Sequence, residues 1–332
     1  MHAIKTMKDA SLTFGEISSV STFIETAVWS RVEAVKRSKE VAVGTPVGSS
    51  AVEFDDVRLH VNSVNGSSAL EVSIGAPSGA FDAKSAREDA QKLLDGELVK
   101  VNERANSGYD LTASVDVDAL AAIEDEAKRA EAVRQIARLR CVIYGSKLRK
   151  HLRTLAETGG QEGPLDWTTH RPRETMFIKP QNEQVTVVFP MRFEDARDAA
   201  IANTFLAQFA EVRRGQKDLS TAPAVSYHKT PPLELNDAPA GETNALDANG
   251  GYVSFVLFKR HCTAERLEST VWNIMTFYAF VSYHIKYSKA YWHSRMRAKV
   301  DSWLSILKRA RKIDPNAEKK MVTASGRTFV RK

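Results

Sequence analysis

The side chains that most often carry catalysis are scattered along this chain. Its 8 histidines and 2 cysteines include no CxxC and no HExxH spacing, so they do not suggest a metal site. Asp55 and Asp56 could act as paired carboxylates, but adjacent acidic residues at a bend between strands are far more often turn residues. His261 and Cys262 are adjacent, and neighbouring residues on a helix do not face each other. Neither pair predicts an acid–base or nucleophilic site.

Phosphate-binding and hydrolase motifs are also missing from the sequence. There is no GxxxxGK[ST], no GxGxxG and no GxSxG. The glycine-rich pieces at 44–48 and 250–251 lack the lysine and the helix that would hold a phosphate. We therefore predict no catalytic residue, no cofactor and no metal ion, and we expect that the protein is not an enzyme.

Composition indicates a folded, soluble protein. The chain has 332 residues, of which 43% are hydrophobic and 27% are charged, which excludes a mostly disordered chain and a collagen-like or coiled-coil rod. Two cysteines cannot form a disulfide framework and indicate reduced thiols in a cytosolic protein. The most apolar stretch, 271–285, is too short and too interrupted to span a membrane. The first twenty residues contain no apolar signal segment, so we expect a cytoplasmic location.

Positive charge is concentrated at the C-terminal end. The net charge is +6, but residues 286–332 contain 14 Lys and Arg against 3 Asp and Glu, so the rest of the chain sums to −5. A basic end on an acidic body suggests an anionic partner such as nucleic acid, a membrane surface or an acidic protein filament. The alternative is a basic helix face that contacts only solvent.

Hydrophobic periodicity predicts an α+β fold. In the first part of the chain, helical spacing predicts helices over 18–40 and 83–101, and alternation predicts strands around 52–54, 57–61, 70–74 and 109–117. In the second part we expect helices over 119–156 and 195–214 and strands over 165–170, 175–179, 185–193, 224–229 and 252–258. Short turns between polar-faced strands favour antiparallel sheets covered by helices.

The order of the elements is similar in both parts, which suggests two tandem related domains. We expect each to be an antiparallel sheet packed by helices, followed by a long protruding C-terminal helix. The predicted divisions are a disordered extension (1–16), a first domain (17–118), a second domain that begins with a long helix (119–262), the C-terminal helix (263–312) and a basic tail (313–332).

The predicted C-terminal helix is too long to be covered by a domain of this size. At ~1.5 Å per residue it would measure roughly 75 Å. Its bulky apolar stripe comprises Ile274, Tyr278, Val281, Ile285, Trp292, Met296, Trp303 and Leu307. Core packing explains the beginning of this stripe. Tryptophans among Lys and Arg towards its end favour contact with another protein.

Several strings in the second half are specific enough to suggest a family. They are ETMFIKPQNEQVTVVF (174–189), YHKTPPLEL (227–235), GYVSFVLFKRH (251–261), YHIKYSKAYWHSRMRAK (283–299), LKRAR (307–311), AEKK (317–320) and SGRTF (325–329). In this order they resemble the subunit 2 family of the actin-related protein 2/3 complex. The resemblance is dense over 165–332 and is carried by pattern alone over 17–118, through 50–62 and 107–117.

The resemblance implies a structural role. Members of this family have two tandem α+β domains, and their C-terminal helix pairs with subunit 4 of the complex. The implied partners are therefore subunit 4, the actin-related proteins 2 and 3, subunits 1, 3 and 5, and the side of an actin filament from which a branch grows. The implied location is the cytoplasmic actin cytoskeleton at the cell cortex.

Two sets of candidate residues follow. The resemblance implies that the aromatic pair Phe277 and Phe280 touches the filament, although the family more often has tyrosine at the second position. The basic end extends this expected filament contact to Arg295, Arg297, Lys299, Lys308, Arg309 and Arg311. The subunit interface is expected to include Ile285, Trp292, Met296, Trp303 and Leu307. The alternative for the aromatic pair and the neighbouring stripe is burial inside this chain.

Nucleic-acid binding is the competing functional hypothesis. A basic helix with interleaved aromatic residues satisfies a first test for it. Nucleic-acid-binding proteins place their basic residues on one face, whereas we expect those of this helix to be spread around it: Lys286, Lys289, Arg297, Lys299 and Arg311. The resemblance and this spread both favour a protein partner over nucleic acid.

Overall fold

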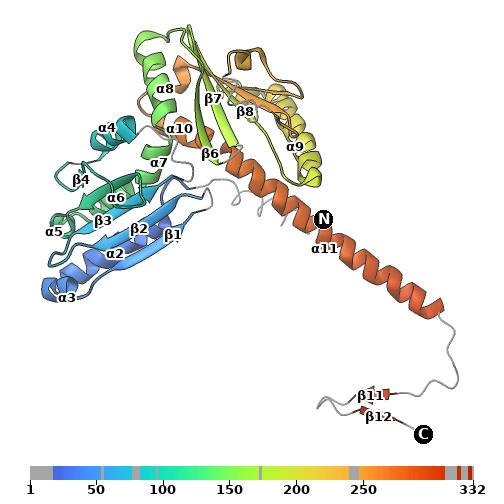
Figure 1. Cartoon of the computed structure of the whole chain (residues 1–332), viewed down its shortest axis with the longest axis horizontal. Coiled ribbons are helices and arrows are strands. Elements are labelled where there is room, and N and C mark those ends of the chain that lie inside the picture. The colour runs from blue at the N-terminus through green and yellow to red at the C-terminus, as the bar shows by residue number, and fades with distance from the viewer. Residues whose placement is uncertain are drawn as a thin grey trace. The chain divides into compact units, whose positions relative to one another are not determined.

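A computed structural model describes residues 18–53, 56–76, 83–94, 96–171, 174–238, 247–310, 320–322 and 328–330 (Figure 1). It divides into two compact units, residues 1–285 and residues 286–332. The helix α11 (Phe277–Ala310) belongs to both units. The predicted extension over 1–16 lies outside the described residues, as does most of the predicted tail over 313–332.

The first sheet contains five antiparallel strands in the order β1-β2-β3-β5-β4. Their bounds are β1 Gly48–Val52, β2 Arg58–Ser63, β3 Leu70–Gly75, β4 Val99–Val101 and β5 Leu111–Val115. The helix α4 (Ala83–Leu93) connects β3 to β4. β4 lies in the stretch for which we predicted a single helix over 83–101, and this part of the prediction is wrong. β4 has only three residues, and a single alternation of buried and exposed side chains is too short a pattern to recognise in sequence.

The second sheet repeats the topology of the first. Its order is β6-β7-β8-β10-β9, and all its pairings are antiparallel. The bounds are β6 Asp166–Arg171, β7 Glu174–Gln181, β8 Gln184–Pro190, β9 Ala224–His228 and β10 Tyr252–Phe258, and α9 (Ala196–Gly215) connects β8 to β9. Three successive strands, a helix and two further strands thus occur twice in the same spatial order. This confirms the predicted class of two antiparallel sheets with helices and a long C-terminal helix.

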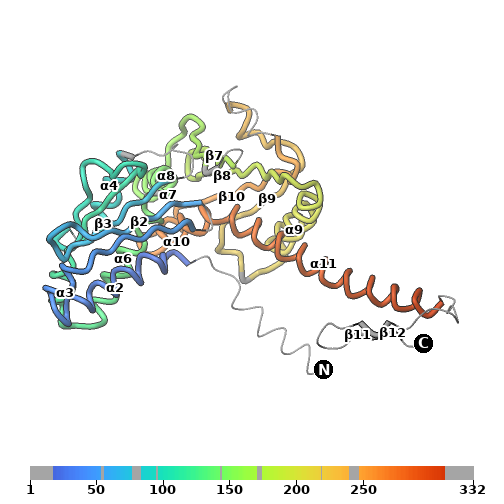
Figure 2. Tube along the Cα trace, turned by 60° about the horizontal axis from the view of Figure 1, so that its bottom comes forward, coloured from blue at the N-terminus to red at the C-terminus, as the bar shows by residue number. Residues whose placement is uncertain are grey.

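Helices cover one face of the first sheet. Leu59, Val61, Val72 and Ala113 point to this face and are fully buried, together with Val28 of α2 (Thr22–Arg37). The opposite face carries polar side chains, such as the Ser73 and Thr112 hydroxyls, which lie 2.9 Å apart. Figure 2 shows α2 running along the sheet. The alternation of apolar and polar residues along these strands follows from this one-sided burial.

The second sheet is apolar on both faces. One face carries Ile178, Val187 and Phe255 and packs against α8 (Ser146–Thr158) and the C-terminal helices. The other carries Phe177 and Val188, which lie in a smaller cluster with the following buried or half-buried residues: Leu165, Trp167, Leu235 and Tyr252. Leu235 belongs to the short 3-10 helix η2 (Leu233–Leu235), so part of the long loop before β10 covers this face. Two other 3-10 turns are η1 (Lys217–Leu219) and η4 (Lys259–His261).

The helix predicted over 18–40 is broken by a serine that caps a second helix. α2 ends at Arg37, and the Ser38 hydroxyl accepts a hydrogen bond from the Val41 N–H at the start of α3 (Lys39–Gly44). Serine favours such capping positions because its side chain satisfies a free backbone N–H.

The helix predicted over 119–156 is in fact four helices. They are α5 Val117–Ala122, α6 Glu126–Ala137, α7 Leu139–Tyr144 and α8 Ser146–Thr158. Asp125 caps α6 by accepting from the Ala127 and Lys128 N–H groups, and Gly145 separates α7 from α8. A Cβ on Gly145 would lie 2.3 Å from Val271, so close packing requires glycine at this break. Gly159 ends α8 in the left-handed conformation (φ 81°), at the TGGQEG sequence where we predicted the end.

The helix expected over 263–312 is divided at Thr276 into α10 (Leu267–Met275) and α11 (Phe277–Ala310). The Thr276 hydroxyl donates to the Trp272 carbonyl at 2.9 Å, and a hydroxyl bond to the carbonyl four residues earlier often bends a helix. In the C-terminal unit, β11 (Lys320–Val322) pairs antiparallel with β12 (Thr328–Val330).

The division between the two sheet-containing parts remains a proposal. We expected the second domain to begin at residue 119. However, Val133, Ile136, Leu139 and Val142 of α6 and α7 are buried in the core of the first sheet. The packing therefore favours a boundary near Gly145 rather than before α5.

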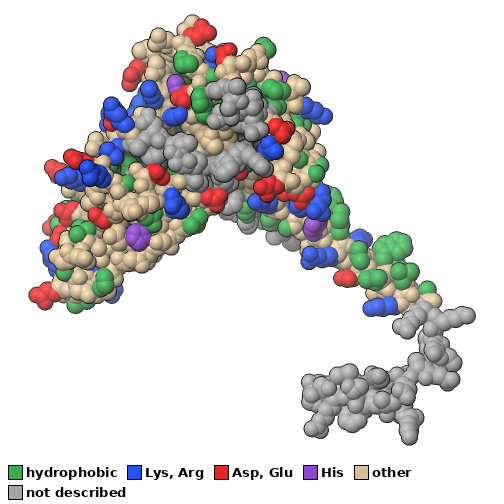
Figure 3. All heavy atoms as spheres, viewed as in Figure 1, with side chains coloured by type: hydrophobic (Ala, Val, Ile, Leu, Met, Phe, Trp, Pro, Cys, Tyr) green, Lys and Arg blue, Asp and Glu red, His purple; other side chains and the backbone are tan. Residues whose placement is uncertain are grey.

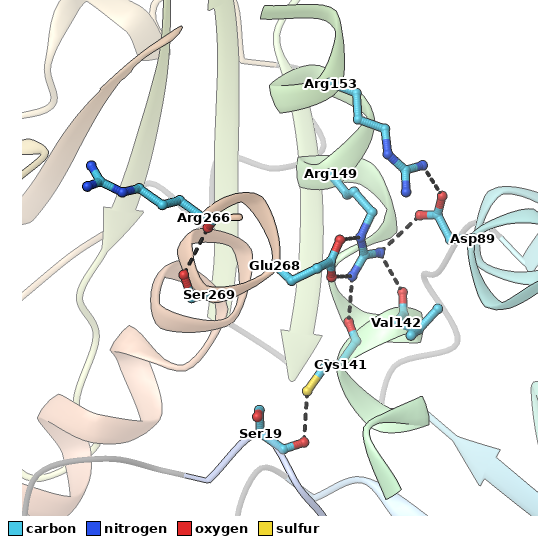
Figure 4. A network of polar contacts seen from close by, with 9 residues as sticks. All are labelled: Ser19, Asp89, Cys141, Val142, Arg149, Arg153, Arg266, Glu268 and Ser269. Atoms are coloured by element: carbon cyan, nitrogen blue, oxygen red, sulfur yellow. Dashed lines mark hydrogen bonds and ion pairs between the residues drawn. The ribbon is translucent and has the colours of Figure 1, made fainter. Parts of the chain in front are cut away.

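A buried arginine joins the two cores (Figure 4). Arg149 of α8 is fully buried and pairs with Asp89 of α4 at 3.0 Å and with both carboxylate oxygens of Glu268 of α10 at 2.8 Å. Its remaining N–H groups donate to the carbonyls of Val142 and Cys141. Burial alone would lower the pKa of Arg149, but the bonds to Glu268 and the charges of Glu268 and Asp89 raise it. The fully paired guanidinium thus holds helices from both cores.

Candidate protein-interaction helix

The C-terminal helix α11 has two segments with different surroundings. We call residues 277–285 the buried segment and residues 286–310 the exposed segment. The division coincides with the boundary between the two compact units. Five of the nine residues of the buried segment are buried and only Tyr283 is exposed, whereas every residue from 290 to 310 is exposed.

Phe277 anchors the buried segment in a cluster of aromatic rings. Its ring centroid lies 4.8 Å from that of Phe255, 5.3 Å from Phe189 and 5.9 Å from Phe209. Only 8% of Phe277 is exposed. Our expectation that Phe277 is exposed is therefore wrong, because the second sheet and α9 place three aromatic side chains around it.

Phe280 lies at the margin of the same core. It is half-buried and its ring centroid is 4.2 Å from that of His284. Its role as a filament contact stays a prediction. Ile285 was expected at a subunit interface, but it is only 1% exposed and packs in the core of the second sheet with Val281. The part of the stripe that precedes residue 286 is thus covered by this chain.

His284 is held among aromatic rings at the end of the buried segment. Phe205, Phe280 and Tyr283 surround its ring at centroid distances of 6.4, 4.2 and 5.4 Å. Burial lowers the pKa of His284. Its Nε2 atom is buried and has no hydrogen-bond partner within the described residues. This arrangement favours the neutral imidazole.

The exposed segment presents an apolar stripe along the helix. Its large side chains are each about half exposed or more: Trp292 59%, Met296 58%, Val300 55%, Trp303 66%, Leu304 48%, Ile306 51% and Leu307 63%. They recur every three or four residues, which places them along one side of a helix. Figure 3 shows the resulting hydrophobic side chains on α11 among basic ones. Contiguous apolar surface of this kind marks a contact with another molecule.

Four of the five residues predicted for the subunit interface lie in this stripe, namely Trp292, Met296, Trp303 and Leu307. Sequence analysis missed Val300, Leu304 and Ile306. Val300 lies four residues after Met296, Ile306 three after Trp303 and Leu304 three before Leu307. These spacings could have indicated them, because the stripe is wider than one line of side chains.

The predicted basic residues of this segment are all exposed: Arg295, Arg297, Lys299, Lys308 and Arg309. The Arg295 guanidinium lies 5.4 Å from the centroid of the Tyr291 ring and donates to the Tyr291 hydroxyl. Successive residues turn by 100° on a helix, so Arg295 and Lys299 point to one side, whereas Arg297 and Lys308 point to nearly the opposite side. Arg311 lies outside the described residues.

The residues that could have carried chemistry have structural partners. Asp56 adopts a left-handed turn conformation (φ 61°), while Asp55 lies outside the described residues. His261 Nδ1 accepts from the Phe258 N–H at 2.9 Å and its Nε2 lies 2.9 Å from the Thr221 carbonyl. Burial raises the pKa of the Cys262 thiol to about 11 and that of Cys141 to about 12. Neither thiol is a ready nucleophile at neutral pH.

The described part of the chain contains neither a metal-binding cluster nor a membrane-spanning helix. No group of three or more His, Cys, Asp or Glu side chains there could hold a metal ion. None of the described helices is long and apolar enough to cross a membrane. The exposed segment of α11 is therefore the most prominent candidate site.

Comparison with known proteins identifies the family. The family profile described as "Arp2/3 complex, 34 kD subunit p34-Arc" matches residues 79–314. The chain belongs to this family.

Two relatives from Arabidopsis thaliana match most of the chain. The chain is 37% identical over 275 residues to "Actin-related protein 2/3 complex subunit 2A", covering 79% of this chain and 82% of the relative. It is 31% identical over 266 residues to "Actin-related protein 2/3 complex subunit 2B", covering 77% and 69%. The p34-Arc match extends to residue 314 and so includes all of α11, buried and exposed segments alike.

Proposed function

We propose that this chain is a structural subunit of an Arp2/3 complex and that the exposed segment of α11 pairs with the homologue of subunit 4. The observation that carries the proposal is the apolar stripe that begins at Trp292, whose large side chains are about half or more exposed. Tryptophans and other large side chains at the centre of an interface contribute about 2–4 kcal/mol each when a partner buries them.

A second part of the proposal concerns the side of an actin filament. Basic residues of the exposed segment, with Arg311 beyond it, provide positive charge for an acidic filament surface. Half-buried Phe280 remains a proposed contact, because part of its ring is accessible. Phe277 is omitted because its ring packs inside the second core.

The proposed role is non-enzymatic. We expect the actin-related proteins 2 and 3 and subunits 1, 3 and 5 to complete the assembly, in the cytoplasmic actin cytoskeleton of the cell cortex. Nucleic-acid binding is not proposed, because the basic side chains point to several sides of α11 rather than to one.

Truncation tests the pairing. A chain that ends at Tyr287 keeps the buried segment and both sheets but loses the apolar stripe. It should fold with an unchanged unfolding temperature, because the described residues that it loses from 290 to 310 are all exposed. It should no longer co-purify with the subunit 4 homologue or with the actin-related proteins.

A chain that ends at Ala310 is the matched control. It lacks the residues after α11 but keeps the complete stripe, and we expect it to assemble. If the chain that ends at Tyr287 also assembled fully, the exposed segment would not be the principal contact.

A further inference from the structure

The strand β1 is an open edge of the first sheet. It pairs with β2 on one side, and no described strand pairs with its other side. The Ser63 N–H donates to the Val47 carbonyl and the Glu53 N–H donates to the Val57 carbonyl, so odd-numbered residues face β2. In an antiparallel pair the alternate residues face away. The backbone N–H and C=O groups of Gly48, Ser50 and Val52 therefore point to the open edge.

The five residues of this edge strand lack the charged residues and proline that usually protect an edge against strand pairing. Its sequence, GSSAV, contains no charged residue and no proline. Soluble proteins commonly protect exposed edges with lysine, proline, bulges or a covering element. Val52, whose backbone N–H and C=O point away from β2, is 67% exposed.

A groove lies directly beside this edge, between β1 and α2. It has a volume of about 640 Å³ and includes Val47 and Ser49 of the β1 side and Phe23 and Ala27 of α2. Val41 of α3 also lines it and is 64% exposed. Side chains of an added strand alternate between two faces, so every second one would enter this groove.

The groove has a positive charge at its base. Arg31 is the only charged residue among those that line it and is 2% exposed. It donates to the carbonyls of Ala42, Thr45, Ser67 and Ser68. These bonds use four of its five N–H groups, and no carboxylate pairs directly with it among the described residues. Asp118 acts on Arg31 only through its charge, being paired with Lys39. An acidic side chain on an occupant would complement Arg31.

We propose that β1 is a docking site for an extended segment of another protein chain, which adds a strand to the first sheet. The segment is apolar at alternate positions, where its side chains enter the groove, and carries one acidic residue that faces Arg31. Backbone hydrogen bonds to Gly48, Ser50 and Val52 hold it, and the groove selects its side chains. The proposal rests on the proposed function, because the segment is supplied by another subunit of the assembly.

Amide exchange in the purified complex tests the added strand residue by residue. The amides of Ser49 and Ala51 are protected by β2 and act as internal controls. An added strand should protect the Ser50 and Val52 amides to within about tenfold of these controls. Rapid exchange at Ser50 and Val52 beside protected controls would overturn the proposal.

Photo-crosslinking identifies the occupant. A p-benzoylphenylalanine placed at Val41 in the complex should crosslink to an extended segment of another subunit with an acidic residue. Crosslinks only to residues 1–17 of this chain, only to a second copy, or to nothing would each overturn the proposal.

Two substitutions of Ser50 distinguish the contribution of its backbone hydrogen bond from that of its side chain. Ser50→Pro removes the outward N–H, which β2 does not use, and should reduce the crosslink at least about tenfold. Ser50→Ala, which also loses the hydroxyl contact with His60, should retain it. An undiminished crosslink in Ser50→Pro would contradict strand addition. Failure of the complex to co-purify at all would instead contradict the proposed function, which the truncations test separately.

Discussion

The two segments of α11 have a similar apolar pattern but different surroundings. Val281 and Ile285 of the buried segment and Trp292 and Met296 of the exposed segment recur at helical spacing, so they continue one stripe. This chain covers the first pair completely and leaves the second pair more than half exposed. An amphipathic pattern therefore indicates that a helix face will be covered, but it does not indicate whether the cover comes from the same chain.

Charge distinguishes the two segments better than hydrophobicity does. Between Glu268 and Lys286 the sequence contains no Asp, Glu, Lys or Arg, and this stretch contains the buried segment. From Lys286 onward, Lys and Arg recur among the apolar residues. Charged side chains are rarely fully buried without partners, so the first lysine marks where the core of this chain ends.

The largest effect is expected from substitutions in the exposed segment of α11. Substituting Trp292 and Trp303 together by Ala should abolish stable pairing with the subunit 4 homologue, since each contributes about 2–4 kcal/mol at an interface. The unfolding free energy of the isolated chain should change by less than about 0.5 kcal/mol, as expected for exposed positions. Co-purification and urea unfolding measure the two effects.

The matched control for the tryptophan pair is Ser294→Ala with Ser305→Ala, which changes exposed residues on the side of the helix opposite the stripe. This variant should assemble normally. Loss of assembly in the control as well would mean that α11 tolerates no substitution, and the stripe would have no special role.

The corresponding change on the buried side is Phe277→Ala. Removal of a ring from a packed aromatic cluster should lower the unfolding free energy by about 3–5 kcal/mol. Phe280→Ala, at the half-buried margin, should cost less, about 1–2 kcal/mol. Denaturant unfolding of the full chain measures both, with Phe277→Leu as a control that retains most of the volume. Equal stability of Phe277→Ala and the unmodified chain would contradict burial of this ring.

A smaller effect is expected from the basic residues of the exposed segment. Replacing Arg295, Arg297 and Lys299 by Gln should weaken filament co-sedimentation of the complex at low salt, by about 0.2–1 kcal/mol per exposed contact. The difference should shrink at physiological ionic strength, because salt screens exposed charges. A deficit that persists at high salt would indicate an apolar filament contact instead.

The smallest effect compares one histidine in each segment. Because the folded-state pKa of His284 is lowered, the unfolded chain binds the proton more readily. Its contribution to stability is therefore full above the unfolded pKa, about 6.5, and is lost as the pH falls through that value. His284→Gln should reduce the drop in urea midpoint between pH 7.5 and 5.5.

His293→Gln, in the exposed segment, serves as the control and should leave the pH dependence unchanged. An equal change in both variants would show that the acid sensitivity does not come from burial of His284.

Strands were easier to predict from this sequence than helix ends. Tyr252–Phe258 was predicted with its observed bounds, because alternating apolar residues between polar loops identify a strand. The breaks at Ser38, Gly145 and Thr276 were missed. Each depends on one hydrogen bond or one close contact, and apolar spacing carries no information about these.

The candidate site was predictable only in part. Spacing identified Trp292 and Trp303, and their exposure agrees with the expected role. Phe277 could not be assigned from sequence, because its surroundings come from Phe189, Phe209 and Phe255, which lie far from it along the chain. Arg149 was also missed. The sequence offers little signal for it, because Lys147, Lys150 and Arg153 are also basic and lie in the same helix.

The Arg149 ion pairs have a consequence for how the chain unfolds. Asp89 belongs to a helix of the first core and Glu268 to a helix of the second, so separation of either core leaves a buried charge without its full set of partners. Removing one partner of a buried ion pair costs about 3–5 kcal/mol. That cost applies to a charge that stays buried; when one sheet unfolds, water reaches Arg149 and the penalty is smaller. A state in which one sheet is unfolded still loses one of the two ion pairs, so the two sheets, although each has its own core, stabilise each other.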